Sequence, residues 1–106
     1  MSLERTIAAL SDPTRRELIR RLAREPLRAR DLARGFSISR PAICKHSRML
    51  AKAGLIQATK SGRERIYELA PNGGKAVKEA IEHLEAMSRL WDVALAAFKD
   101  YAEAKK

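Results

Sequence analysis

The sequence is poor in several residue types that define whole classes of protein. Its 106 residues include one cysteine, Cys44, so the chain can form neither an internal disulfide nor a cysteine metal cluster. A single cysteine favours a reducing, intracellular setting. There are two histidines, and neither they nor the carboxylates are spaced like a catalytic pair or a nucleophile with its base. We therefore expect the chain not to be an enzyme.

Long hydrophobic runs are also missing. The N-terminus has no apolar segment typical of a secretion signal, and the longest unbroken apolar run, Val93 to Phe98, is far too short to span a bilayer. These features predict a cytoplasmic protein. At this length we expect one domain, residues 1–106, with a modest core and a need for a partner for stability or function.

Positive charge, in contrast, is abundant and unevenly placed. The formal net charge is +9: residues 1–70 hold 16 Lys or Arg against 7 Asp or Glu, whereas residues 71–106 hold 6 of each. Such segregation is typical of a surface that binds a polyanion. The alternative is a composition that is merely biased toward arginine on helix surfaces.

Residues 37–50 predict a short helix with two different faces. Ser39 is a good N-cap, and Pro41 fits the first turn, where a missing N–H costs nothing. At about 100° per residue, Ile43, Ser47 and Leu50 share one face, and Pro41, Cys44, Lys45 and Arg48 share the other. A basic, solvent-facing first turn is typical of a helix that enters a DNA groove, although an ordinary amphipathic surface helix has the same pattern.

The residues before this helix predict three others. One spans Leu3 to Leu10, a second runs from Pro13 to about Arg24 with Asp12 as its N-cap, and a third spans about Arg28 to Arg34. The buried stripe of the second helix is Leu18, Ile19 and Leu22, and most of its arginines, Arg15, Arg16, Arg20, Arg21 and Arg24, are expected to be solvated.

A tight turn is predicted between the third helix and residues 37–50. Gly35 suits the left-handed position that follows a helix, and Phe36 and Ile38 are expected to pin the turn into the core. A helix, a glycine-containing turn and a capped second helix form a helix-turn-helix, here at about residues 28–52.

The pattern then changes to that of a β-hairpin. Leu55 to Lys60 and Glu64 to Leu69 are strand-like runs on either side of Ser61 and Gly62, and they define a wing at about residues 55–69. The register stays open, because a two-residue turn and a longer loop starting at Lys60 both fit. Three cations gather at this tip, either to contact DNA phosphates or enter the minor groove, or as a merely solvated turn: Lys60, Arg63 and Arg65.

A long final helix is predicted at about residues 75–104. Steps of alternately three and four residues along it meet only apolar side chains: Val77, Ala80, Leu84, Met87, Trp91, Ala94, Phe98 and Tyr101, with Ile81 and Leu95 widening the stripe. A unit of about 70 residues cannot cover so long a stripe alone. We expect it to pack partly on its own domain and partly on the same helix, or the first helix, of a second subunit.

Five blocks in fixed order resemble the ArsR family of small dimeric winged-helix repressors. They are residues 10–16 (LSDPTRR), 31–33 (DLA), 39–46 (SRPAICKH) with Arg48 and Leu50, 53–56 (AGLI), and 62–63 (GR) with Tyr67 and Leu69. The resemblance implies a mainly α fold with a small β-hairpin: four helices, a two-stranded wing and a long C-terminal dimerisation helix. It also implies that residues 39–50 enter the major groove.

The family's metal-sensing motifs are absent. Members that sense metals carry Cys-x-Cys-Asp-Leu in the third helix, where this chain has Arg28 and Arg30 in place of the two thiolates, and a guanidinium cannot bind a metal. On the last helix only His83 is available, with Glu79 one turn before it. A weak site shared across a dimer and a plain surface ion pair are both open, and we expect no metal and no cofactor.

Two further departures lie within residues 37–50. Ser47 stands where the family usually has a core leucine, and we expect its hydroxyl to bond a backbone carbonyl one turn back. Cys44 stands where the family usually has serine. It is either a small contact or a reactive thiol beside Lys45 that acts as a redox switch.

These observations lead to one functional hypothesis, a sequence-specific regulator, most simply an autoregulatory repressor that binds an inverted repeat in double-stranded DNA as a homodimer. The expected DNA-binding residues are Ser39, Arg40, Pro41, Cys44, Lys45, Arg48, Arg63 and Arg65, with His46 open between packing and phosphate contact. The expected dimer interface is Leu3, Ile7, Leu84, Met87, Trp91, Leu95 and Phe98. A sequence-indifferent nucleoid-type protein and a protein-interaction winged helix are the alternatives.

Overall fold

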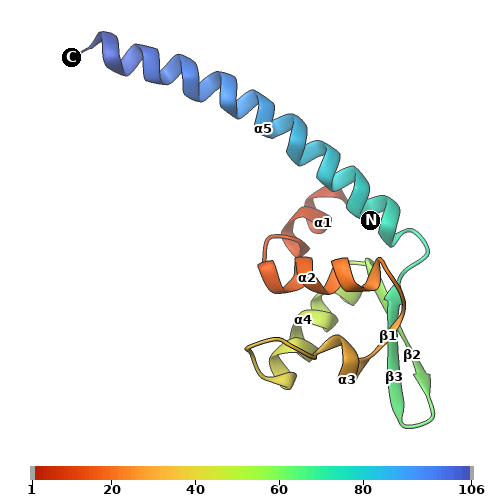
Figure 1. Cartoon of the computed structure of the whole chain (residues 1–106). Coiled ribbons are helices and arrows are strands. Elements are labelled where there is room, and N and C mark those ends of the chain that lie inside the picture. The colour runs from red at the N-terminus through yellow and green to blue at the C-terminus, as the bar shows by residue number, and fades with distance from the viewer. Residues whose placement is uncertain (1, 106) are drawn as a thin grey trace.

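The computed structural model describes residues 2–105 and confirms a mainly helical fold with a small antiparallel sheet (Figure 1). In chain order its elements are α1 (Leu3–Ala9), α2 (Pro13–Leu22), β1 (Leu27–Arg28), α3 (Ala29–Leu32), α4 (Arg40–Lys52), β2 (Ile56–Ser61), β3 (Glu64–Leu69) and α5 (Gly73–Ala104). Helices α1 to α4 and the sheet form the body of the molecule, and α5 extends away from it.

The predicted starts of α2 and α4 are confirmed by their caps. The Asp12 carboxylate accepts hydrogen bonds from the backbone N–H groups of Thr14 and Arg15, at 2.7 and 3.3 Å. The Ser39 hydroxyl accepts from the N–H of Ala42 at 3.3 Å. Each cap satisfies donors that the first turn of a helix leaves unpaired, and each therefore fixes where its helix begins.

The turn between α3 and α4 is partly as predicted. Gly35 has a φ of +84°, a left-handed conformation that favours glycine, and Phe36 packs against the buried core. The prediction that Ile38 pins the turn is wrong, because 38% of its surface is exposed. Phe36 alone anchors the turn, which leaves Ile38 on the surface just before α4.

The sheet has three strands in the order β1-β3-β2, where two were expected. Leu27 and Arg28 form β1 and pair antiparallel with Tyr67 and Ile66 of β3, so Arg28 lies in a strand and not, as predicted, in the third helix. In the hairpin, Ser61 pairs with Glu64, so the turn consists of two residues, Gly62 and Arg63. Gly62 has a φ of +62°, as the first position of a tight two-residue hairpin turn requires.

The core confirms the predicted buried stripes of α2 and α4. Its buried side chains come from α1, α2, α3, α4, the strands and the beginning of α5: Ala9, Leu10, Leu18, Ile19, Leu22, Leu32, Ile43, Leu50, Leu55, Ile56, Tyr67 and Ala80. Helix α5 joins this core through a close approach at Gly73, where an added Cβ would lie 2.1 Å from the Leu55 carbonyl oxygen. Only glycine allows α5 to start so close to the body.

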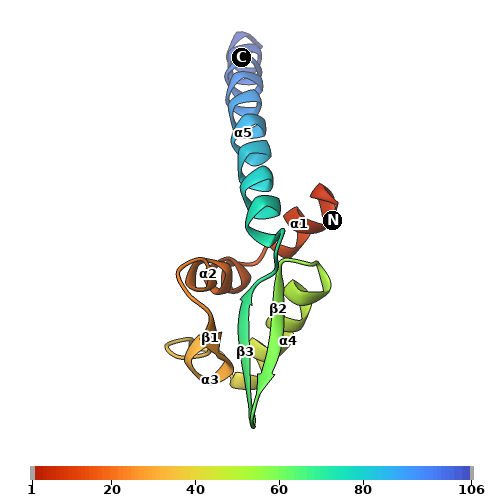
Figure 2. The same cartoon turned by 90° about the vertical axis from the view of Figure 1, so that its right-hand side faces the viewer.

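Most of α5 lies outside the body. Val77 and Ala80 pack against the core, and α1 lies beside the first turns of the helix (Figure 2). Beyond these residues the helix extends away from the body. The molecule therefore measures 67 Å along its long axis, with the far end of α5 at one end and the tip of the hairpin at the other. The fold therefore has two separate exposed regions, the hairpin end and the far half of α5.

Candidate nucleic-acid interface

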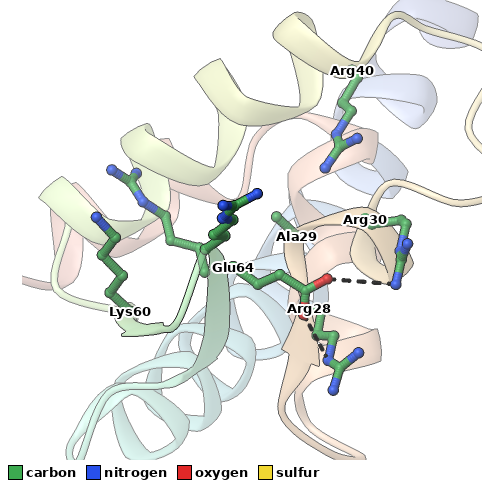
Figure 3. A pocket seen from close by; sticks show the side chains of 8 residues that line it. Arg28, Ala29, Arg30, Arg40, Lys60 and Glu64 are labelled. Carbon is green, nitrogen blue, oxygen red and sulfur yellow. Dashed lines mark ion pairs between the residues drawn. The ribbon is translucent and has the colours of Figure 1, made fainter.

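An open groove of about 380 Å³ lies at the hairpin end of the body, where three segments that are far apart in the sequence meet (Figure 3). The start of α4 contributes Arg40, β1 and the start of α3 contribute Arg28 to Arg30, and the hairpin tip contributes the rest. The lining residues are Arg28, Ala29, Arg30, Arg40, Lys60, Arg63, Glu64 and Arg65. Six of the eight are cations, which makes this groove a natural site for an anion.

The register of the hairpin adds a second sign that an anion binds here. Lys60 and Arg65 are directly opposite each other on the paired strands, and both side chains are exposed. Like charges in this position destabilise a hairpin. Arg63 occupies the turn beside them. A polyanion that neutralised these three side chains would remove the repulsion between them.

Helix α4 presents the basic face that its sequence predicts. Ile43, Ser47 and Leu50 are buried, whereas Arg40, Pro41, Lys45 and Arg48 are exposed and Cys44 is half-buried. The Ser47 hydroxyl donates to the carbonyl oxygen of Ile43 at 3.0 Å, as expected. The buried hydroxyl is thus satisfied within the helix, and the contact of α4 with the core comes from Ile43 and Leu50.

His46 is held by the body of the molecule. Its Nδ1 lies 3.1 Å from a guanidinium nitrogen of Arg15. Because a guanidinium has no acceptor, this contact requires Nδ1 to be the accepting nitrogen. The Nε of Arg15 also donates to the Ala9 carbonyl oxygen at 2.6 Å. This contact favours the packing role for His46 over a phosphate contact.

The expectation that most arginines of the second predicted helix are solvated is confirmed for Arg16, Arg20 and Arg24, which are exposed, and is wrong for Arg15 and Arg21. Arg15 is buried, with 8% of its surface exposed. Arg16 donates to the Leu10 carbonyl oxygen at 2.9 Å. Arg21 donates to the carbonyl oxygens of Leu32 and Arg34 at 2.9 and 2.7 Å and lies over the Phe36 ring at 4.3 Å. These side chains hold α2 to α1 and to the turn before α4.

Arg28 and Arg30 line the groove, although the sequence pointed to them only as substitutes for metal ligands. Nε of Arg28 lies 3.1 Å from one carboxylate oxygen of Glu64, and a guanidinium nitrogen of Arg30 lies 3.5 Å from the other (Figure 3). Arg28 lies in a strand of two residues and Arg30 in a helix of four residues, and both elements are too short to show a periodic pattern. The basic charge of the segment was therefore the only sign in the sequence that these arginines belong to the site.

The residues expected at a dimer interface lie on α1 and α5, away from the groove. Ile7 is half-buried and packs against the core, whereas the others are exposed: Leu3, Leu84, Met87, Trp91, Leu95 and Phe98. Exposure rises along the helix, from 40% at Met87 to 67% at Phe98. So large an apolar surface on one helix is typical of an interaction site.

Residues 2–105 lack two other kinds of feature. No three His, Cys, Asp or Glu side chains gather there in a way that could hold a metal ion. Among the described helices, none is both long and apolar enough to cross a membrane.

The groove, α4 and the hairpin together define a winged helix-turn-helix, a class of DNA-binding domain. A family model described as bacterial regulatory protein, arsR family, matches residues 12–58. The chain is 36% identical over 97 residues to the HTH-type transcriptional regulator Rv2034 of Mycobacterium tuberculosis, an alignment that covers 92% of this chain and 85% of that protein. The chain therefore belongs to the ArsR family of transcriptional regulators.

Two further comparisons agree with this assignment. The transcriptional repressor SdpR of Bacillus subtilis is 38% identical over 61 residues, 58% of this chain and 68% of that protein. A solved structure of an ArsR-like transcriptional regulator from Rhodococcus sp. RHA1 matches with a TM-score of 0.63 and 38% identity, and covers 94% of this chain and 92% of that one.

Proposed function

We propose that the protein is a homodimeric repressor that binds an inverted-repeat operator ahead of its own gene. The observation that carries the proposal is the groove of six cations between the start of α4 and the hairpin tip. It puts the exposed first turn of a helix, which reads bases, next to a wing that contacts phosphates. Repression is supported by the similar repressor SdpR, and control of its own gene is what the family resemblance implies.

The roles of individual residues follow from their positions. Arg40 is the first residue of α4 and points into the groove, which suits a bidentate contact to guanine (Figure 3). Lys45, one turn later on the exposed face, contacts a base or a phosphate. Small apolar contacts to bases come from Pro41 and Cys44, the N-cap Ser39 lies beside them, and phosphates are neutralised by Arg48, Arg63 and Arg65.

The dimer is supported by the exposed part of α5. Trp91 and Phe98 are 60% and 67% exposed, and burial of aromatic side chains of this size is among the largest gains available to an interface. Two-fold symmetry would then place two copies of α4 in successive major grooves, roughly 34 Å apart. An inverted repeat is the DNA sequence that matches this symmetry.

The experiment that tests the proposal is a footprint of the purified protein on the DNA upstream of its gene. It is paired with a competition between that duplex and a scrambled duplex of equal composition. We expect a protected inverted repeat and a clear preference for the upstream duplex. Equal binding to both duplexes would instead identify a nucleoid-type protein, and weak binding to both would identify a protein-interaction domain.

Two measurements test the remaining parts of the proposal. Sedimentation should show a dimer, and Leu95→Glu, which puts a charge into the exposed apolar stripe, should produce monomers, whereas Arg89→Glu on the opposite face of the same helix should not. With roughly 6 to 10 phosphate contacts per dimer, affinity should fall about 10³ to 10⁵-fold between 50 and 200 mM salt. A flat salt response would contradict the electrostatic role of the groove.

A further inference from the structure

Glu64 is the one carboxylate among the eight side chains that line the basic groove. It is the first residue of β3, next to the hairpin turn, and its two oxygens are shared between Arg28 of β1 and Arg30 of α3 (Figure 3). A negative charge in a groove that faces DNA repels phosphates and lowers affinity. Attraction between the groove and DNA therefore cannot explain why a glutamate occupies position 64.

Stability does not explain this glutamate either. The side chains of Arg28, Glu64 and Arg30 are 55%, 40% and 61% exposed, and ion pairs between exposed charges contribute little to folding. The strands β1 and β3 are already joined by backbone pairing of Arg28 with Ile66. The two ion pairs are consequently weak enough to be exchanged for other partners.

The geometry makes Glu64 a direct competitor of a DNA phosphate. Arg28 is paired with Ile66, two residues after Glu64, so the arginine and the carboxylate are diagonal neighbours on one face of the sheet. A carboxylate and a phosphate bind a guanidinium through the same N–H groups. Either Glu64 or a phosphate can occupy the donors of Arg28 and Arg30.

We propose that Glu64 is a specificity-determining residue, which withholds Arg28 and Arg30 from phosphates in loose, sequence-independent complexes. In a loose complex a phosphate reaches the two guanidinium groups but is not held in place, so the carboxylate keeps their N–H groups. Close docking of α4 into an operator holds phosphates against the arginines and replaces the carboxylate. The two arginines then add affinity only when the correct sequence is bound. This inference rests on the proposed function, because it concerns how the same groove discriminates between DNA sequences.

The test compares Glu64→Gln with Glu68→Gln on the upstream and scrambled duplexes. Glu68 is a matched control, because it lies on the same strand and pairs with Gln57 outside the groove. For Glu64→Gln we expect the scrambled duplex to bind about eightfold more tightly at 0.1 M salt for each additional phosphate that the released arginines neutralise, with a salt slope steeper by about 0.9. The upstream duplex should bind less than twofold more tightly, so discrimination falls. Glu68→Gln should leave discrimination unchanged.

The same Glu64→Gln substitution in a protein that lacks both arginines shows whether they cause the tighter binding to the scrambled duplex. In a protein with Arg28→Gln and Arg30→Gln, adding Glu64→Gln should no longer strengthen binding to the scrambled duplex. The proposal is overturned if Glu64→Gln weakens binding, if it strengthens both duplexes equally, or if the tighter binding persists without the two arginines. Failure of Glu64→Gln to fold also overturns it, because the argument requires that these ion pairs contribute little to stability.

Failure of the proposed function would look different. It would appear in the wild-type protein as equal binding to the two duplexes, before any variant is measured. The dependence of the Glu64→Gln effect on Arg28 and Arg30 would then still show whether the carboxylate withholds these arginines from phosphates.

Discussion

Two groups of arginines in this chain look alike in sequence and differ in what their guanidinium groups contact. The anchoring arginines of α2 are Arg15, Arg16 and Arg21, and each donates to backbone carbonyl oxygens of another segment. The groove arginines are Arg28, Arg30, Arg40, Arg63 and Arg65, which come from three separate segments and converge at the hairpin end. The first group holds the body together, and the second gives it a surface for an anion.

The difference shows that the role of an arginine depends on the group that its guanidinium contacts, rather than on the number of arginines nearby or on the helix that carries it. Removing a guanidinium that is buried against carbonyl oxygens lowers stability, because the acceptors stay behind without donors. In the second group, Arg28 and Arg30 share one exposed carboxylate, and the other guanidinium groups lie among cations that offer them no attraction until an anion binds. Substitution in the first group should therefore affect folding, and substitution in the second should affect binding.

The largest effect is expected for Arg15→Met, which keeps the length of the side chain and removes its donors. The carbonyl oxygen of Ala9 and Nδ1 of His46 would both lose a hydrogen bond to a buried charge. We expect the free energy of unfolding to fall by about 2–4 kcal/mol in urea denaturation. Arg20→Met is the control, since Arg20 makes only an exposed pair with Glu17. Equal stability of the two variants would remove the distinction between the groups.

Next in size is Arg40→Ala, which should lower discrimination between the operator and other DNA by about 1–3 kcal/mol. The physical reason is that Arg40 begins α4 and points into the groove, where it is free to contact a base edge (Figure 3). Its urea midpoint should match that of the wild-type protein. If discrimination survives the substitution in a competition titration, Arg40 is not the residue that reads the sequence.

Local features of the fold could be predicted from the sequence because their causes lie within a few residues. Asp12 and Ser39 cap helices through the next backbone N–H groups, and Gly35 adopts the left-handed conformation that the end of a helix favours. The error at Ile38 has a related cause, since the turn needs one apolar anchor and Phe36 already provides it.

The features that escaped prediction depend on distant partners. Arg15 is buried because its guanidinium meets His46, 31 residues later in the chain. Arg28 and Arg30 join the groove because β1 pairs with β3 and because Glu64 lies between the two guanidinium groups. No periodicity in the sequence records these pairings, so charge segregation indicated that a basic site exists but not which residues form it.

A smaller and uniform effect is expected for Arg63→Ala. Arg63 lies in the hairpin turn, where we propose that it contacts a phosphate rather than a base. Loss of one phosphate contact should weaken every duplex about eightfold at 0.1 M salt and reduce the salt slope by about 0.9. Titrations of operator and scrambled DNA at several salt concentrations measure both quantities. If Arg63→Ala weakened binding to the operator alone, Arg63 would contact a base rather than a phosphate.

The smallest effect is on the pH dependence of stability, and it concerns Asp12, the N-cap of α2 that precedes the anchoring arginines. Loss of water around Asp12 raises the pKa of its carboxyl. The N–H groups of Thr14 and Arg15 and the positive charge of Arg15 outweigh this desolvation and hold the pKa of the Asp12 carboxyl below its ordinary value. A lowered folded pKa means that the stabilisation is complete above the ordinary pKa of aspartate and is lost as the pH falls through the lower one.

Asp12→Asn isolates this contribution, because asparagine is also a good N-cap but does not titrate. Its unfolding free energy should change less than that of the wild-type protein as the pH falls across that acidic range, and DNA binding at neutral pH should be the same for both. If the unfolding free energies of the two proteins fell equally with decreasing pH, carboxylates other than Asp12 would control stability at low pH.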